Sequence, residues 1–192
     1  MILLAVYPLV AAWLLGETLV TWTRHATAPA ADAADRYSSK MVAGGIVSGL
    51  VLAEGLRRAP GPGLVGSLTA TPALARYAGL VLVIGAVALR WISMVTLRQQ
   101  FTTNLVIVAG HTLVTHGVYR YVRHPSYLGG TLGFLGLGLS VGGPLGAVVV
   151  ATPIGLAYRY RMRVEERMLR DAFGERYLGY ARTTKRLIPG VY

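Results

Sequence analysis

The chain has 192 residues, of which 54% are hydrophobic and only 14% are charged. Because soluble proteins carry roughly a quarter charged residues, this balance indicates a membrane protein. Cysteine is absent, which excludes disulfides, thiolate nucleophiles and cysteine-ligated zinc or iron–sulfur sites. The net charge is +11. Its cations flank apolar stretches and crowd the C-terminus, so we expect membrane lipids and no nucleic acid as partners.

The first half of the chain predicts three membrane-spanning helices. Their apolar stretches can cross a bilayer at about 1.5 Å per residue, and they comprise Ile2–Trp22, about Ser38–Leu56 and Ala73–Leu97. Two charges, Glu17 and Arg90, stand inside these stretches. We expect Glu17 to lie near an interface or to bond to another helix. Arg90 either extends to the interface or finds a partner in the bundle.

A helical hairpin is predicted after these three spans. Residues 125–158 contain no Asp, Glu, Lys, Arg or His, and they are too many for one crossing of a bilayer. Gly142-Gly143-Pro144 cuts them into two halves. The charge-free turn should lie outside, and the basic segments 98–123 and 159–186 inside. We therefore expect an all-α integral membrane bundle of about five transmembrane helices, with a cytoplasmic C-terminus.

One polar stretch interrupts the apolar second half of the chain. It runs from His111 to Tyr127 and reads HTLVTHGVYRYVRHPSY. Pro125 marks a helix start, because proline is tolerated in a first helical turn and disfavours helix in the residue before it. A helix N-terminus presents free N–H groups that suit a carboxylate or a phosphate. The stretch therefore predicts a site for a charged small molecule, whereas its histidines lack the spacing of a helical zinc pair, so we expect no metal.

Residues 158–180 predict an amphipathic helix at the membrane surface. At about 100° per residue, Glu166 falls on the polar side, where we expect it to be solvated, together with Arg159, Arg163, Arg167 and Arg170. Arg161 and Glu165 instead fall in the middle of the apolar side. A buried charge must be paired or must serve a ligand. These two residues therefore either pair with each other as i,i+4 neighbours or complete a pocket with the polar stretch, which the hairpin brings near.

Three blocks of the chain read HTLVTHGVYRYVRHPSYLGG, RMRVEERML and FGERYLGYARTTKRLIPGVY. In sequence, order and spacing they closely resemble the isoprenylcysteine carboxyl methyltransferase family of integral-membrane enzymes. The resemblance covers about residues 98–192, whereas the first half matches only in hydropathy. It implies a three-span membrane region, 1–97, and a methyltransferase core, 98–192, with a cofactor loop, the hairpin and the C-terminal helix.

The resemblance implies transfer of a methyl group from S-adenosylmethionine to a lipophilic acceptor, with S-adenosylhomocysteine as product. It implies cofactor contacts from His111, Thr112, Leu113, Val114, Tyr119, His124, Pro125, Ser126, Tyr127 and Glu165. Arg161 would contact the acceptor, and Arg161 and Glu165 would be the catalytic residues. The implied acceptor is a prenylcysteine-type carboxylate, and the cofactor site would lie on the cytoplasmic side. The alternatives are a phospholipid amine, a small thiol, or, from a different class, a non-catalytic membrane scaffold.

Overall fold

The computed structural model describes residues 2–25, 33–58, 71–98, 112–190 and 192. Its elements in chain order are α1 (Ile2–His25), α2 (Ala33–Arg58), α4 (Ala73–Leu97), the short 3-10 helix η2 (Gly117–Arg120), α5 (Pro125–Phe173) and α6 (Glu175–Thr183). The predicted all-α fold is confirmed. The three predicted spans of the first half coincide with α1, α2 and α4, although α2 already begins at Ala33.

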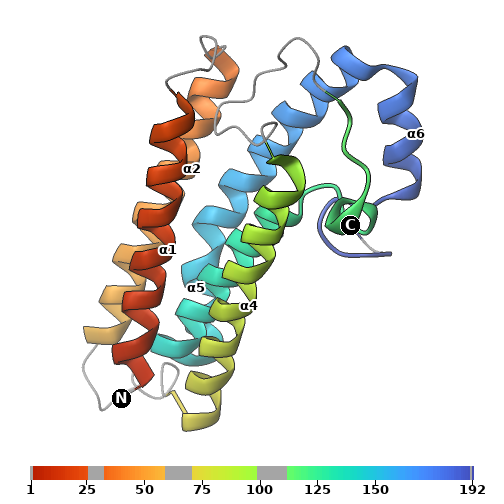
Figure 1. Ribbon diagram of the computed structural model, residues 1–192. Coiled ribbons are helices and arrows are strands. Elements are labelled where there is room, and N and C mark those ends of the chain that lie inside the picture. The colour runs from red at the N-terminus through yellow and green to blue at the C-terminus, as the bar shows by residue number, and fades with distance from the viewer. Residues whose placement is uncertain (1, 26–32, 59–70, 99–111, 191) are drawn as a thin grey trace.

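The long helices lie side by side as one bundle, and α6 lies beyond one end of it (Figure 1). Three of the described helices are long and apolar enough to cross a membrane, over Asp35–Arg58, Ala73–Leu97 and Pro125–Phe173, and α1 contains the shorter apolar stretch Val6–Leu19. Large apolar side chains such as Leu74 face outward. Helices that are apolar on their outer side suit lipid as solvent, so the chain is an integral membrane protein.

The long helix α5 is a hairpin of two limbs, residues 125–141 and 144–173. Between them Gly142 and Gly143 leave the helical conformation, and Gly143 has φ 60°, which glycine adopts without steric cost. The limbs approach most closely where Gly138 faces Gly146. A Cβ on Gly138 would lie 2.2 Å from the Gly146 carbonyl oxygen, so small residues permit this contact. The predicted hairpin is confirmed.

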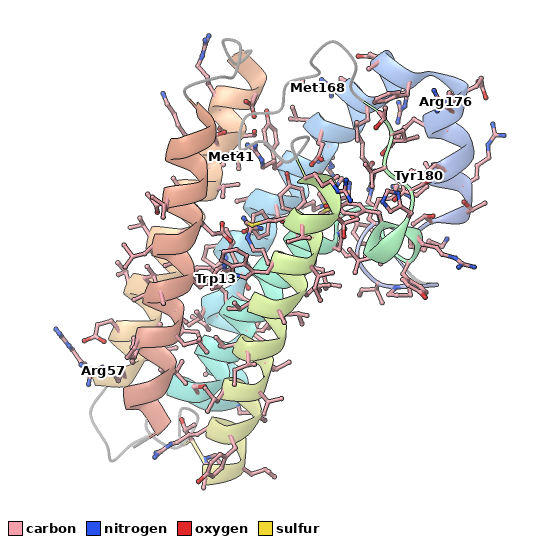
Figure 2. All side chains as sticks on the ribbon, viewed as in Figure 1. Trp13, Met41, Arg57, Met168, Arg176 and Tyr180 are labelled. Atoms are coloured by element: carbon pink, nitrogen blue, oxygen red, sulfur yellow. The ribbon has the colours of Figure 1, made fainter. Side chains whose placement is uncertain are left out.

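The second limb of α5 extends past the bundle and forms most of the expected C-terminal helix. It continues without a break to Phe173, and α6 begins at Glu175 after Gly174, whose φ is 52°. The four arginines predicted on the polar side are exposed, namely Arg159, Arg163, Arg167 and Arg170. Figure 2 shows Met168, Arg176 and Tyr180 at the end of the molecule away from Arg57. This extension brings Glu165 and Glu166 next to the start of the first limb.

The core of the bundle holds the first limb of α5 in place. Phe134 and Leu137 of that limb are each 1% exposed, and Val83 of α4 is fully buried. The Trp13 ring of α1 meets the Phe134 ring edge to face, with centroids 6.2 Å apart. Burying such side chains from three helices fixes the limb along its length, and thereby the position of Pro125 at its start.

Candidate active site

The C-terminal tail fixes the residues that lead into α5. The Arg123 amide donates to the Lys185 carbonyl oxygen at 2.8 Å, and the His124 amide donates to the Arg186 carbonyl oxygen at 3.0 Å. The helix begins at Pro125, as its sequence predicts. His124 is only 3% exposed. Two backbone hydrogen bonds from a distant part of the chain therefore set the position of this imidazole.

Glu166 lies at the centre of a cluster that we call the tail clasp, made of the buried Glu166 and His124 and the partly buried Arg123 and Arg186. Arg186 Nη2 donates to Glu166 Oε2 at 2.6 Å, and Arg123 Nη2 donates to Oε1 at 2.8 Å. His124 Nε2 lies 3.2 Å from the same Oε1. Glu166 is 4% exposed, so the prediction of a solvated Glu166 is wrong. The tail covers Glu166, whereas the four arginines that periodicity placed on the same side stay exposed.

The charged groups of the tail clasp stabilise one another. The hydrogen bond between Arg186 and Glu166 raises the pKa of the Arg186 guanidinium above its ordinary value. Arg186 also donates to the Tyr192 hydroxyl at 3.3 Å and lies over the Tyr192 ring. Because both oxygens of Glu166 accept charge-assisted hydrogen bonds, this carboxylate is bound by the protein itself. It holds the loop and the tail together.

The neighbouring Glu165 has a different environment. Its Oε2 atom is buried and has no hydrogen-bond partner among the described residues. It lies 3.6 Å from His124 Nδ1, and the His124 ring stacks on Tyr127 with centroids 5.5 Å apart. A buried carboxylate oxygen without a donor is costly. This oxygen therefore marks a place that a ligand's hydrogen-bond donor can fill. It lies beside His124 and Tyr127, which the sequence also singled out.

Tyr119 of η2 adds an aromatic wall near Glu165. It is 7% exposed. Burial, and then the Glu165 carboxylate, raise the pKa of the Tyr119 phenol well above its ordinary value. Tyr180 of α6 donates its hydroxyl hydrogen to the Tyr119 carbonyl oxygen at 2.6 Å, and burial raises the pKa of Tyr180 to about 12. The contact from α6 thus positions η2 against the site.

The beginning of the polar stretch runs toward η2 without regular secondary structure. Thr112 is exposed, and Leu113 and Val114 are half-buried. His111 lies outside the described residues. Cofactor contacts by these four residues stay predictions.

Arg161 is buried, as its position on the apolar side predicts, and its guanidinium reaches across to α2. Its Nε donates to the Tyr127 hydroxyl at 3.1 Å. Its Nη1 lies 3.2 Å from Asp35 Oδ1 and donates to the hydroxyls of Ser38 and Ser39 at 2.9 and 2.8 Å. The sequence did not single out Asp35. An acid in the first turn of α2, followed by two serines on the same helix face, was the signal available.

Arg90 has a partner within the bundle, which decides between the two expectations for it. Its guanidinium pairs with Glu17 of α1, and its Nη1 donates to the Ser126 hydroxyl at 2.8 Å and the Ser126 carbonyl oxygen at 3.0 Å. Trp13 Nε1 donates to Glu17 at 2.6 Å. The carboxylate is thus bonded between helices, one of the two options for Glu17. The network joins α1 and α4 to the first turn of α5, beside the site.

Comparison with known proteins shows which enzymes this chain resembles. The chain is similar to protein-S-isoprenylcysteine O-methyltransferase A of Arabidopsis thaliana, 35% identical over 115 residues that cover 59% of the chain and 58% of the relative. It is 37% identical to the Rattus norvegicus protein-S-isoprenylcysteine O-methyltransferase over 116 residues, which cover 58% of the chain and 40% of the relative. The chain therefore spans well under two thirds of these relatives' lengths. The resemblance seen in the sequence is confirmed.

The fold is also found in a solved structure. The structure of the eukaryotic intramembrane Ras methyltransferase, an isoprenylcysteine carboxyl methyltransferase, matches with a TM-score of 0.55 and 23% identity, over 83% of this chain and 54% of that chain. At this identity the likeness concerns the fold. A family profile described as phospholipid methyltransferase matches residues 74–176, which is more than half of the chain and includes α4 and all of α5. The chain therefore belongs to the phospholipid methyltransferase family.

Proposed function

We propose that this protein is a membrane methyltransferase that moves a methyl group from S-adenosylmethionine to a lipophilic acceptor. The observation that carries the proposal is the buried, unpartnered Oε2 of Glu165, placed 3.6 Å from His124 at the start of α5. The methyltransferases among its relatives support the reaction class. The donor supplies an electrophilic methyl group on a positively charged sulfur.

The residues around Glu165 fit the groups of that donor. Glu165 can accept hydrogen bonds from its ammonium group or its ribose hydroxyls. The first-turn amides of α5, after His124, lack intrahelical acceptors and suit its carboxylate. The buried ring of Tyr119 and the half-buried ring of Tyr127 can lie near its positive sulfur. Pro125 and Ser126 shape the same turn, and His111, Thr112, Leu113 and Val114 would line the purine.

The protein's contribution to the reaction is positioning and exclusion of water. A rigid first limb and the tail clasp hold His124 and Glu165 in one place, so that donor and acceptor meet with little loss of freedom during the reaction. Arg161 and Glu165 are the proposed catalytic residues, with Arg161 binding the acceptor. A carboxylate acceptor would already be ionised at neutral pH, whereas an amine or a thiol would have to lose a proton.

Two kinds of molecule are candidates for the methyl acceptor. The names of the relatives favour a prenylcysteine-type carboxylate, and the description of the family profile favours a phospholipid headgroup amine. Either acceptor is lipophilic and would enter from the bilayer between helices. We propose that the cofactor enters from the cytoplasm, because the exposed arginines of the second limb and the positive-inside rule put that end of the bundle inside. We also propose that 98–192 forms the methyltransferase core and 1–97 its membrane support.

Cofactor binding tests the enzyme class. Purified protein in detergent should bind S-adenosylmethionine, measured by calorimetry. Glu165→Ala and His124→Ala should each weaken binding by about tenfold to a hundredfold, because the first removes the proposed acceptor of the donor's ammonium group or ribose and the second removes the imidazole beside that acceptor. Arg167→Ala, an exposed change on the same turn of α5, is the matched control. Equal affinity in all four proteins would place the cofactor elsewhere, and no binding by the unchanged protein would favour a scaffold.

Turnover tests the role of Arg161. We expect Arg161→Ala to keep cofactor affinity and to lose transfer, when membranes are incubated with labelled S-adenosylmethionine and the labelled lipid is identified. Loss of cofactor affinity in the same variant would assign Arg161 to the donor pocket.

A further inference from the structure

The Arg161 side chain is neutralised before any acceptor arrives. Asp35 is fully buried, and its Oδ1 lies 3.2 Å from Arg161 Nη1. The same Nη1 donates to the Ser38 and Ser39 hydroxyls. The side chains of Arg161 and Asp35 are 7% and 0% exposed, so water screens this pair little. The pair carries no net charge, and an incoming carboxylate would meet Asp35 as well as Arg161.

The second oxygen of Asp35 lacks a donor. Oδ2 is buried and has no hydrogen-bond partner among the described residues. Asp35 stands in the first turn of α2, where the free backbone N–H groups of a helix attract negatively charged side chains. A buried carboxylate oxygen without a partner is most readily satisfied by an N–H or O–H group of a ligand.

Arg161 links this oxygen to the donor site. Its Nε donates to the Tyr127 hydroxyl at 3.1 Å, and the Tyr127 ring stacks on His124, which lies beside Glu165. Arg161 therefore contacts both Tyr127, which lies beside the donor site, and Asp35. The reacting head group of an acceptor bound by Arg161 would lie within reach of both the donor and Asp35.

From this arrangement we propose that Asp35 is a specificity-determining residue of the acceptor site. It favours a head group that carries an N–H or O–H donor and no negative charge, and it disfavours a carboxylate. This inference rests on the proposed function, because it takes Arg161 to be the acceptor-binding residue. Asp35 lies in α2, outside residues 74–176 that match the family profile, so the selectivity belongs to this chain's own N-terminal half.

The test measures binding without turnover. Three ligands share one farnesyl thioether tail and differ only in the head group, which is a carboxylate, a carboxamide or a primary ammonium. Their affinities are measured on the full chain in detergent with saturating S-adenosylhomocysteine. The unchanged protein should bind the carboxamide and the ammonium at least about tenfold more tightly than the carboxylate, because two like charges a few ångströms apart in a buried site repel strongly.

The variant Asp35→Asn keeps the shape of the side chain and removes its charge. It should strengthen carboxylate binding by about tenfold or more and weaken ammonium binding by a similar factor, with little change for the carboxamide. Ser39→Ala is the control, because it removes an uncharged partner of the same guanidinium and should leave the ratio of the three affinities unchanged. A ratio of affinities within one protein does not depend on the yield of folded material.

Three results would overturn the proposal. These are equal affinity of the unchanged protein for carboxylate and carboxamide, an equal change in all three affinities in Asp35→Asn, and no binding of any of the three ligands. The second result would mean that the Asp35–Arg161 pair only ties α2 to α5. Failure of the proposed function is a separate result, since it would appear as loss of S-adenosylmethionine binding or as indifference of that binding to Glu165 and His124.

Discussion

Glu165 and Glu166 are neighbours in α5, but their carboxylates differ in their hydrogen-bond partners. Both oxygens of Glu166 are bound by the tail clasp, whereas the buried Oε2 of Glu165 has no partner among the described residues. A carboxylate whose partners all come from the protein has a structural role. A half-buried carboxylate with one buried oxygen that has no donor is the one that we propose binds a ligand. One helical step of about 100° separates the two roles.

The largest expected effect comes from breaking the tail clasp. Glu166→Ala leaves the mostly buried Arg123 and the buried His124 without their common acceptor, which costs about 3–5 kcal/mol of stability. The measurement is chemical or thermal unfolding of the purified protein in detergent. Glu175→Gln, an exposed acid in the first turn of α6, is the control. An unchanged midpoint for Glu166→Ala would mean that the cluster is not what holds the tail.

A change at the neighbouring residue, Glu165, should separate the effect on cofactor binding from the effect on stability. Glu165→Gln should unfold at nearly the temperature of the unchanged protein and should lose about tenfold to a hundredfold in affinity for S-adenosylmethionine, since it removes a charge-assisted hydrogen bond. Thermal unfolding and calorimetry on one preparation give both values. If Glu165→Gln destabilises the protein as much as Glu166→Ala does, the contrast between the two carboxylates is lost.

A third buried network, within the bundle, sharpens the comparison. Glu17→Gln and Arg90→Gln, singly and together, form a double-mutant cycle across α1 and α4. Because the two side chains form an ion pair and are 22% and 10% exposed, we expect a coupling energy of about 0.5–3 kcal/mol in unfolding. Purely additive effects would contradict the pairing. Ser126→Ala tests whether the network also reaches the cofactor, through a change in its affinity.

The smallest expected effect is at Tyr180. Tyr180→Phe removes one hydrogen bond to the Tyr119 backbone and should cost about 0.5–1.5 kcal/mol. Burial raises the folded-state pKa of Tyr180 from 10.0 to about 12. The unfolded chain therefore releases this proton first, and stability should fall between about pH 10 and 12. Unfolding midpoints across that range should fall less steeply in Tyr180→Phe, and an unchanged slope would argue against the burial of this phenol.

The sequence predicted the helices and the site residues on them from local patterns. Pro125 starts α5, and Gly142-Gly143 turns it back on itself. Helical periodicity correctly put Arg161 among the buried residues and four arginines of the same segment on the exposed side. These features depend on residues a few positions apart, whose geometry within a helix or a turn is fixed.

The partner of each buried charge was decided only by tertiary structure. Periodicity placed Glu166 in solvent, but the returning tail brings Arg186 against it. Asp35 was not singled out by the sequence, and only the packing of α2 on α5 sets it against Arg161. A helical pattern predicts on which side of its own helix a side chain lies. Which distant segment covers that side depends on how whole helices pack, and that information is spread over the chain.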